Sequence, residues 1–95
     1  PGRHPRTRLL IAYTVLLSPR ADRDRRGLSD TIRLRIRKTL LALETDPRPT
    51  GAAKLSGERN RWRVRVGDYR ILYEVDDASR QVLVLRIAHR RAAYR

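Results

Sequence analysis

Arginines alternate with apolar residues along the stretch R-W-R-V-R-V-G-D-Y-R-I-L-Y-E-V, which runs from residue 61 to residue 75. A period of two on both sides of Gly67-Asp68 predicts two strands closed by a two-residue turn. Glycine at the first central position suits a type II′ turn. In that register Arg65 lies opposite Arg70, although two like charges placed opposite each other destabilise a strand pair. Because arginine forks bind phosphate bidentately, the pattern predicts a binding surface for a polyanion.

The two faces of this predicted hairpin differ in character. The basic face carries Arg61, Arg63, Arg65 and Arg70, with Glu74 opposite Arg61. The other face is apolar, and we expect it to form the core rather than to stack on bases, because a lone tryptophan in an alternating strand is more often buried. Its members are Trp62, Val64, Val66, Tyr69, Ile71 and Tyr73.

Two helices are expected before the hairpin. A first strand at residues 12–17 is followed by Ser18-Pro19, a serine N-cap with proline at the first helical position. That helix is short and almost wholly charged up to Gly27, so we expect it to be weak or frayed. The second helix, at residues 28–44, can be capped by Ser29 or Asp30 and has one apolar face. This face is made of Leu28, Ile32, Ile36, Leu40 and Leu43.

The remaining segments complete a small α+β domain. Residues 50–60 are predicted to be a loop, and residues 81–87 a third strand that is apolar on both faces and therefore central. The expected fold is an N-terminal strand, a two-helix segment and a three-stranded antiparallel meander. Its helices should cover the face that carries Trp62 and Ile71. We expect residues 11–95 to form one domain and residues 1–10 to be a flexible basic extension.

Composition limits the possible partners. The chain of 95 residues has 23 Lys and Arg against 10 Asp and Glu, a formal net charge of +13. Such a charge favours nucleic acid, an anionic membrane surface or an acidic protein. No apolar run approaches the roughly 20 residues of a membrane-spanning helix. Without cysteine, disulfides and thiolate metal sites are excluded, but the redox compartment is not informed. Residues 1–8 lack the pattern of a signal peptide, so we expect a cytoplasmic protein, and we expect no metal or cofactor.

Four segments together resemble a known family. They are Y-T-V-L-L-S-P at residues 13–19, K-L-S-G at 54–57, W-R-V-R-V-G-D-Y-R-I-L-Y-E-V-D-D at 62–77 and V-L-R-I-A-H-R-R-A-A-Y-R at 84–95. This combination resembles the RelE/ParE toxin superfamily of bacterial toxin–antitoxin systems. The resemblance implies a RelE-like fold and a ribosome-dependent mRNA endonuclease held inactive by a RelB-like antitoxin. Its expected partners are that antitoxin, the ribosome and mRNA, with no membrane and with oligomers formed only through the antitoxin.

The resemblance also implies roles for individual residues. Arg63 and Arg65 match strand positions that carry basic active-site residues in some RelE toxins, and Arg70 matches the arginine at the scissile phosphate. Arg90 and Tyr94 match the C-terminal basic residue and the tyrosine used in proton handling and base stacking. Lys54 matches a loop lysine of the family that contacts the RNA backbone. With Arg61 of the basic face, the predicted RNA-binding set is Lys54, Arg61, Arg63 and Arg65.

Two departures from the family pattern concern proton transfer. Arginine stands in place of lysine at residues 63 and 65, which keeps the charge but weakens any proton transfer, because its pKa exceeds 12. His89 is the only residue in this region whose unperturbed pKa suits general acid–base catalysis. Catalysis and packing are both open for His89, as are stacking and proton handling for Tyr94.

Other functions remain open at this point. A ParE-like toxin, which poisons DNA gyrase by binding without cleavage, would share the fold and the G-D-Y-R hairpin. A plain nucleic-acid-binding module would need only the charge. Arg61 is alternatively an ion-pair partner of Glu74. The helix arginines Arg33, Arg35 and Arg37 are expected to be solvated or to face an antitoxin.

Overall fold

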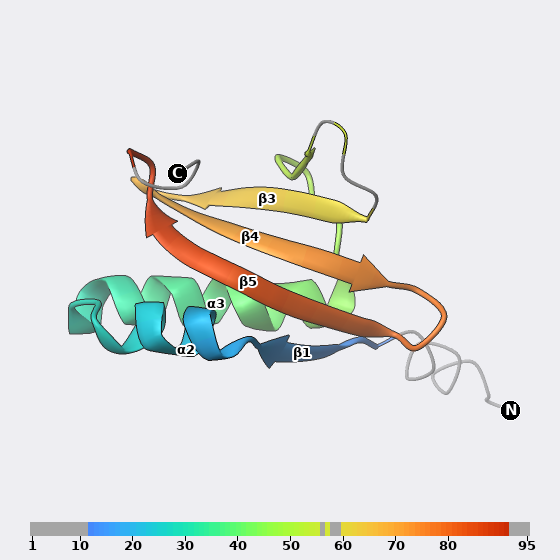
Figure 1. The fold of residues 1–95 in the computed structure, drawn as a ribbon, viewed down its shortest axis with the longest axis horizontal. Helices are drawn as coiled ribbons and strands as arrows, with labels where there is room; N and C mark the ends of the chain where they lie inside the picture. The colour runs from blue at the N-terminus through green and yellow to red at the C-terminus, as the bar shows by residue number, and fades with distance from the viewer. Residues whose placement is uncertain (1–11, 56, 58–59, 92–95) are drawn as a thin grey trace, which may run out of the picture.

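The structure is a computed structural model that describes residues 12–55, 57 and 60–91. A five-stranded sheet in the order β1-β5-β4-β3-β2 carries both helices on one face (Figure 1). β1 pairs in parallel with β5, and the other neighbours are antiparallel. The strands are β1 (Thr14–Leu17), β2 (Ala53–Lys54), β3 (Arg61–Val66), β4 (Tyr69–Asp76) and β5 (Gln81–His89), and the helices are α2 (Pro19–Arg26) and α3 (Asp30–Thr45). The expected α+β architecture is confirmed.

The β3–β4 hairpin has the predicted register. Val66 pairs with Tyr69, Arg65 with Arg70, and Arg61 with Glu74. Gly67 has φ +59°, and Asp68 is not among the residues with positive φ, as a type II′ turn requires. The alternation therefore places the arginines of the hairpin on the face without helices.

β5 lies inside the sheet, as its apolar character on both faces predicted. It pairs with β1 on one side and with β4 on the other, and it extends to His89 rather than ending at residue 87. A register shift at Leu72/Tyr73 interrupts its ladder with β4. The first strand is shorter than expected, beginning at Thr14 rather than at residue 12.

The segment predicted as a loop at residues 50–60 contains the short strand β2. Ala53 pairs with Arg63 and Lys54 with Trp62, and the Leu55 N–H donates to the Arg61 carbonyl at 2.9 Å. Two residues are too few for an alternating pattern, so the sequence carried no signal for this strand.

α2 was expected to be weak or frayed, and the structure shows a regular helix that is capped at both ends. Its side chains bond to the part of β5 that extends beyond β1. The Asp24 carboxylate accepts hydrogen bonds from the Ile87 N–H and the Arg86 Nε, both at 2.9 Å, and the Ser18 hydroxyl donates to the Leu85 carbonyl at 3.1 Å. Ser18 also caps the helix by accepting from the Ala21 N–H. These long-range bonds hold a helix that buries only Ala21.

α3 supplies the helical side of the core. Ser29 caps it, and its apolar stripe packs Ile36 and Leu43 fully out of solvent, with Leu28, Ile32 and Leu40 beside them. The sheet contributes residues from β4 and β5. The largest fully buried side chains are Tyr73, Ile36, Leu43, Ile71, Val75, Val82 and Val84. The helices thus cover the predicted face, and within residues 12–55, 57 and 60–91 no helix covers the opposite face.

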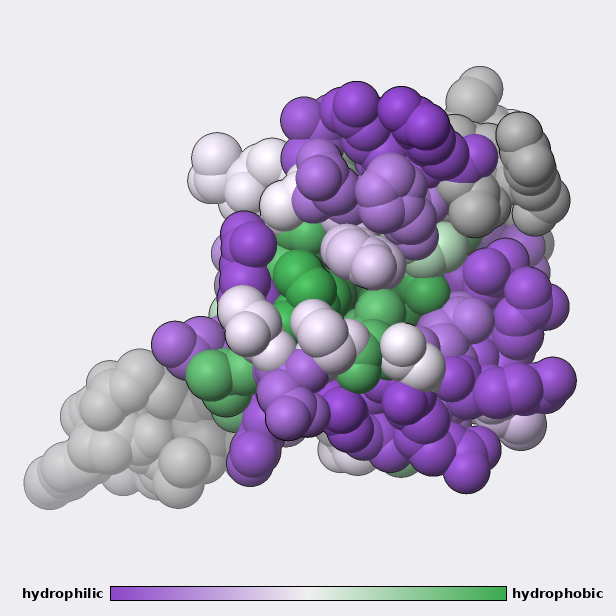
Figure 2. All heavy atoms as spheres, turned by 90° about the vertical axis from the view of Figure 1, so that its left-hand side faces the viewer, coloured by the Kyte–Doolittle hydropathy of each residue, from purple (hydrophilic) through white to green (hydrophobic). Residues whose placement is uncertain are grey.

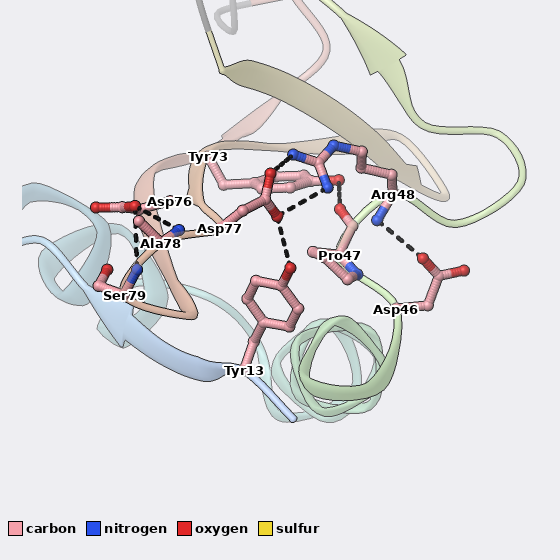
Figure 3. Close-up of polar contacts among 9 residues, drawn as sticks. All are labelled: Tyr13, Asp46, Pro47, Arg48, Tyr73, Asp76, Asp77, Ala78 and Ser79. Carbon is pink, nitrogen blue, oxygen red and sulfur yellow. Dashed lines mark hydrogen bonds and ion pairs between the residues drawn. The ribbon is translucent and has the colours of Figure 1, made fainter. Parts of the chain in front are cut away.

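A polar cluster holds the end of the sheet farthest from the hairpin turn (Figure 3). The Arg48 guanidinium donates to both Asp77 oxygens, at 3.2 and 2.8 Å, and the Tyr13 hydroxyl donates to the same carboxylate. Arg48 also lies over the Trp62 ring, 5.5 Å from its centroid. The buried Tyr73 hydroxyl donates to the Pro47 carbonyl at 2.7 Å. The cluster ties the chain before β1, the segment after α3 and the β4–β5 turn together.

Candidate functional site

Arginine side chains gather on the open face of the sheet near the hairpin turn. Arg65 and Arg70 are a directly opposed pair, and Arg63 lies two residues from Arg65 on the same face. Arg65 is exposed, whereas Arg63 and Arg70 are half-buried. We call Arg63, Arg65, Arg70 and Arg90 the arginine cluster.

The cluster is electrostatically strained at Arg70. Partial burial of the guanidinium lowers the pKa of Arg70, and the positive charges of Arg63, Arg65 and Arg90 lower this pKa further. Each of these effects disfavours the charged form, so keeping Arg70 protonated in the folded state is energetically unfavourable. An anion bound among these side chains would remove that repulsion.

The backbone of the turn fixes Arg90 beside the hairpin. The Arg90 N–H donates to the Asp68 carbonyl at 2.7 Å, directly after β5. The C-terminal end of β5 and the β3–β4 turn are thereby joined, which brings a charge from residue 90 to those from residues 63–70. The structure thus brings together four of the six predicted catalytic residues.

A further arginine reaches this end of the molecule from the helical side. A β-carbon added at Gly67 would lie 3.1 Å from Nη1 of Arg35, so this α3 side chain packs against the turn. Figure 2 faces the turn end of the molecule and shows hydrophilic residues above and below a group of apolar ones. Nothing in the sequence distinguishes Arg35 from its solvated neighbours, because its helical spacing matches theirs.

Arg61 belongs to an ion pair. Its Nε donates to the Glu74 carboxylate at 2.6 Å, across the β3–β4 ladder. The predicted register already allowed this ion pair as the alternative to an RNA-binding role for Arg61. The Glu74 carboxylate offsets the charge of Arg61, which weakens its predicted role as an RNA contact.

Lys54 lies on the other face from the arginine cluster. It pairs with Trp62, so its side chain shares the face of Trp62 and not that of Arg63. Lys54 is exposed at the outermost strand of the sheet. The structure does not bring it together with the predicted phosphate contacts.

His89 is also separated from the cluster. It pairs with Tyr69, so it occupies the helix-covered face, and its ring meets the Tyr69 ring edge-on at a centroid distance of 5.5 Å. Its Nδ1 accepts a hydrogen bond from the Arg91 N–H at 3.3 Å. These contacts favour the packing interpretation of His89 over catalysis. Tyr94 lies outside the described residues.

Residues 12–55, 57 and 60–91 contain no group of three or more His, Cys, Asp or Glu side chains that could hold a metal ion. Within the same ranges, no helix combines the length and apolar character needed to cross a membrane.

Fold and site together define a class. The mixed five-stranded sheet with two helices on one face is the fold of the solved RelE toxins. The family model for the ParE toxin of the parDE type II toxin–antitoxin system matches residues 15–94. The chain therefore belongs to the RelE/ParE superfamily and is a toxin of a type II toxin–antitoxin system. A comparison with the curated proteins finds no match.

Solved structures of RelE proteins are similar over most of the chain. The RelBE2 toxin–antitoxin complex of Mycobacterium tuberculosis contains a chain that is 30% identical, with a TM-score of 0.74, covering 82% of this chain and 98% of that one. An Escherichia coli RelE mutant in the free state is 27% identical, with a TM-score of 0.75 and coverages of 87% and 88%. The archaeal RelE–RelB complex of Pyrococcus horikoshii contains a chain that is 25% identical, with a TM-score of 0.76, covering 86% of this chain and 99% of that one.

Proposed function

We propose that this toxin is a ribosome-dependent endoribonuclease that cleaves translated mRNA without a metal. The observation that carries the proposal is the arginine cluster, in which four guanidinium groups from two adjacent strands and the end of a third share one open face. RNA supplies its own nucleophile, the 2′-OH. Attack on the adjacent phosphorus breaks the bond to the 5′ oxygen and gives a 2′,3′-cyclic phosphate and a 5′-OH. The protein has to orient the strand, stabilise the transition-state charge and handle two protons.

Arg70 is the proposed contact of the scissile phosphate. Its half-buried guanidinium is held in place by the ladder, and a preorganised donor of this kind stabilises charge that develops in the transition state. Arg63, Arg65 and Arg90 would hold the flanking phosphates. Because arginine stays protonated, proton transfer falls to another group, for which Tyr94 is the candidate.

A gyrase poison is the second candidate function, and the match to the ParE family model favours it. Such a toxin would act by binding alone. Primer extension on translated mRNA after brief induction separates the two functions. Cuts within codons support the endoribonuclease, whereas intact mRNA with broken DNA supports the gyrase poison. Tyr94→Phe extends the test, because a loss of cleavage rate with the ring retained would indicate proton handling.

We also propose that an acidic, partly disordered RelB-like antitoxin neutralises the toxin. RelE chains of three of the similar structures were crystallised in complexes with RelB or within RelBE. Here α3 exposes Leu34 (55%) and Leu41 (50%), two turns apart, beside a groove of about 390 Å³ whose rim includes Arg33 and Arg37. An amphipathic helix with acidic flanks fits an apolar stripe bordered by arginines.

Co-expression tests the antitoxin proposal. The toxin alone should be poorly tolerated by a bacterium, and the pair with its cognate antitoxin should be tolerated and purify as a complex. Leu34→Glu should weaken the complex strongly, because it puts a charge on the exposed apolar surface formed by Leu34 and Leu41. A lone protein that is well expressed and harmless would contradict the toxin's proposed action.

A further inference from the structure

A hollow of about 330 Å³ lies at the outer edge of β3, beside the arginine cluster. It is lined by Thr50, Gly51, Arg63, Val64 and Arg65. It exists because β2 is short and pairs only with Trp62 and Arg63. The chain before β2 bends away in a turn in which the Ala52 N–H donates to the Pro49 carbonyl at 2.9 Å. Gly51, at φ +96°, occupies the third position of that turn, where type II geometry needs a positive φ.

The groups around this hollow suit an anion. Arg63 and Arg65 are on the same strand face, and Thr50, which carries a hydroxyl, lines the hollow from the turn. The ladder supplies a further donor. The Leu55 N–H donates to the Arg61 carbonyl, so the odd-numbered residues of β3 direct their backbone N–H and C=O groups toward β2. The N–H of Arg65 therefore points to the same side of β3, at a position beyond the end of β2. The five lining residues include no carboxylate.

The position of the hollow relates it to Arg70. Arg65 is directly opposite Arg70, and neighbouring strands lie about 4.8 Å apart. The hollow is on the far side of Arg65 from Arg70, so an anion in the hollow and an anion at Arg70 would lie on either side of Arg65.

We propose that this hollow binds the RNA backbone phosphate adjacent to the one held by Arg70. The inference rests on the proposed endoribonuclease function and deepens it, because it gives the RNA a path. The strand would cross the hairpin from β4 over β3 to the outer edge, with Thr50 and the Arg65 N–H fixing its register. Phosphate contacts of this kind position a strand without reading its sequence.

A matched pair of charge changes tests the path. Thr50→Glu puts a carboxylate into the hollow, and Thr14→Glu makes the same change of net charge on exposed β1 at the opposite edge of the sheet. Each variant is titrated with a non-cleavable 2′-O-methyl RNA hexamer. We expect Thr50→Glu to weaken binding about tenfold or more and to reduce the log–log salt slope by about 0.7, the loss of one phosphate contact. Thr14→Glu should stay within about twofold of the parent, and equal losses in the two variants would overturn the proposal.

A second measurement separates the hollow from the enzymatic function. The backbone amide resonances of Gly51 and Arg65 are followed by NMR during titration with inorganic phosphate and with the same hexamer, with Gly27 as a distant reference. We expect Gly51 and Arg65 to shift in both titrations while Gly27 does not. If phosphate shifts them in a protein that neither cleaves nor binds RNA, the hollow stands as an anion site and the endoribonuclease proposal fails. If the protein cleaves mRNA but these amides do not respond to the hexamer, the path across β3 is wrong.

Thr50→Val offers a milder control that keeps the shape of the side chain. Loss of the hydroxyl donor should weaken hexamer binding about three- to tenfold, the size of one hydrogen bond. Thr50→Ser should restore it. An unchanged affinity in Thr50→Val would remove Thr50 from the site.

Discussion

Arg65 and Arg70 face each other across the β3–β4 ladder, one step from the turn. In a hairpin closed by two residues, this position is a non-hydrogen-bonded pair, where the Cα atoms approach to about 4.5 Å and the side chains are close. Two guanidinium groups therefore meet where repulsion is greatest, and the pKa of Arg70 is lowered by partial burial and by the neighbouring arginines. A sheet selected for stability alone would not keep this pair. The proposed contact with RNA phosphates would relieve this repulsion.

Arg70→Ala should separate function from stability. The change removes one charge from a repulsive pair, so the melting temperature should hold or rise slightly. Single-turnover cleavage of ribosome-bound mRNA should slow by roughly 10²–10³, as expected when one preorganised donor is lost. Arg23→Ala, on the exposed side of α2, removes the same charge away from the cluster and should cleave normally. An Arg70→Ala protein with normal melting and the parental rate would refute the assignment of Arg70.

Asp24 should matter more for stability than its neighbour Asp22. Asp24→Ala leaves the Ile87 N–H without its side-chain acceptor and frees Arg86, which should cost about 1–3 kcal/mol in the free energy of unfolding. Asp22 bonds only to Arg25 and Arg26 within the described residues, and such exposed pairs contribute little. Urea denaturation of Asp22→Ala and Asp24→Ala compares the two carboxylates within one helix. Equal losses would mean that α2 is not held through β5.

The sequence predicted the hairpin and α3 well because both repeat a simple period. Alternation fixed the register from Arg61 to Glu74, and the apolar spacing of Ile32, Ile36 and Leu43 defined the helix. It failed for α2, whose Asp24 bonds to a strand more than sixty residues away. Local pattern contains no information about such partners.

The site was predictable to a similar extent. Alternation predicts that Arg63, Arg65 and Arg70 lie on the same side of the sheet. The sides on which Lys54 and His89 lie depend on strand pairings that the sequence did not reveal. Lys54 pairs with Trp62 and His89 with Tyr69, so each lies on the helix-side face of the sheet. The hollow beside Thr50 also depends on where β2 ends.

Asp77 should make stability depend on pH in the acid range. Hydrogen bonds from Arg48 and Tyr13 hold the pKa of this carboxyl below its usual value. A depressed folded-state pKa stabilises the fold above the unfolded pKa of about 3.9, and this contribution is lost as the pH falls through the folded pKa. Urea denaturation should therefore show the parent to be more stable than Asp77→Asn at pH 6, with the difference shrinking below about pH 4. A difference independent of pH would mean that the charge of Asp77 is unimportant to the cluster.

Tyr73 should make stability depend on pH in the alkaline range. Burial raises the pKa of its hydroxyl to about 12. The folded state therefore binds the proton more tightly than the unfolded state, whose tyrosine pKa is about 10, so stability is lost as the pH rises from 10 toward 12. Tyr73→Phe removes this loss but also the bond to the Pro47 carbonyl, at a cost of about 1 kcal/mol near neutrality. The two unfolding free energies should converge above pH 10, and parallel curves would contradict a buried phenol.

Substitution of Gly67 should cost stability because of its backbone conformation. Its φ of +59° is disfavoured for residues with a β-carbon, and that carbon would lie 3.1 Å from the Arg35 guanidinium, a flexible group that can move aside. Backbone strain is therefore the main cost, and Gly67→Ala should lower the free energy of unfolding by about 1–2 kcal/mol. Gly67→Asn should cost less, because asparagine tolerates positive φ. Arg35→Ala serves as the control for the displaced side chain, and denaturant unfolding of the three variants gives the ranking. If Arg35→Ala abolished the penalty of Gly67→Ala in the double variant, steric contact rather than φ would limit residue 67.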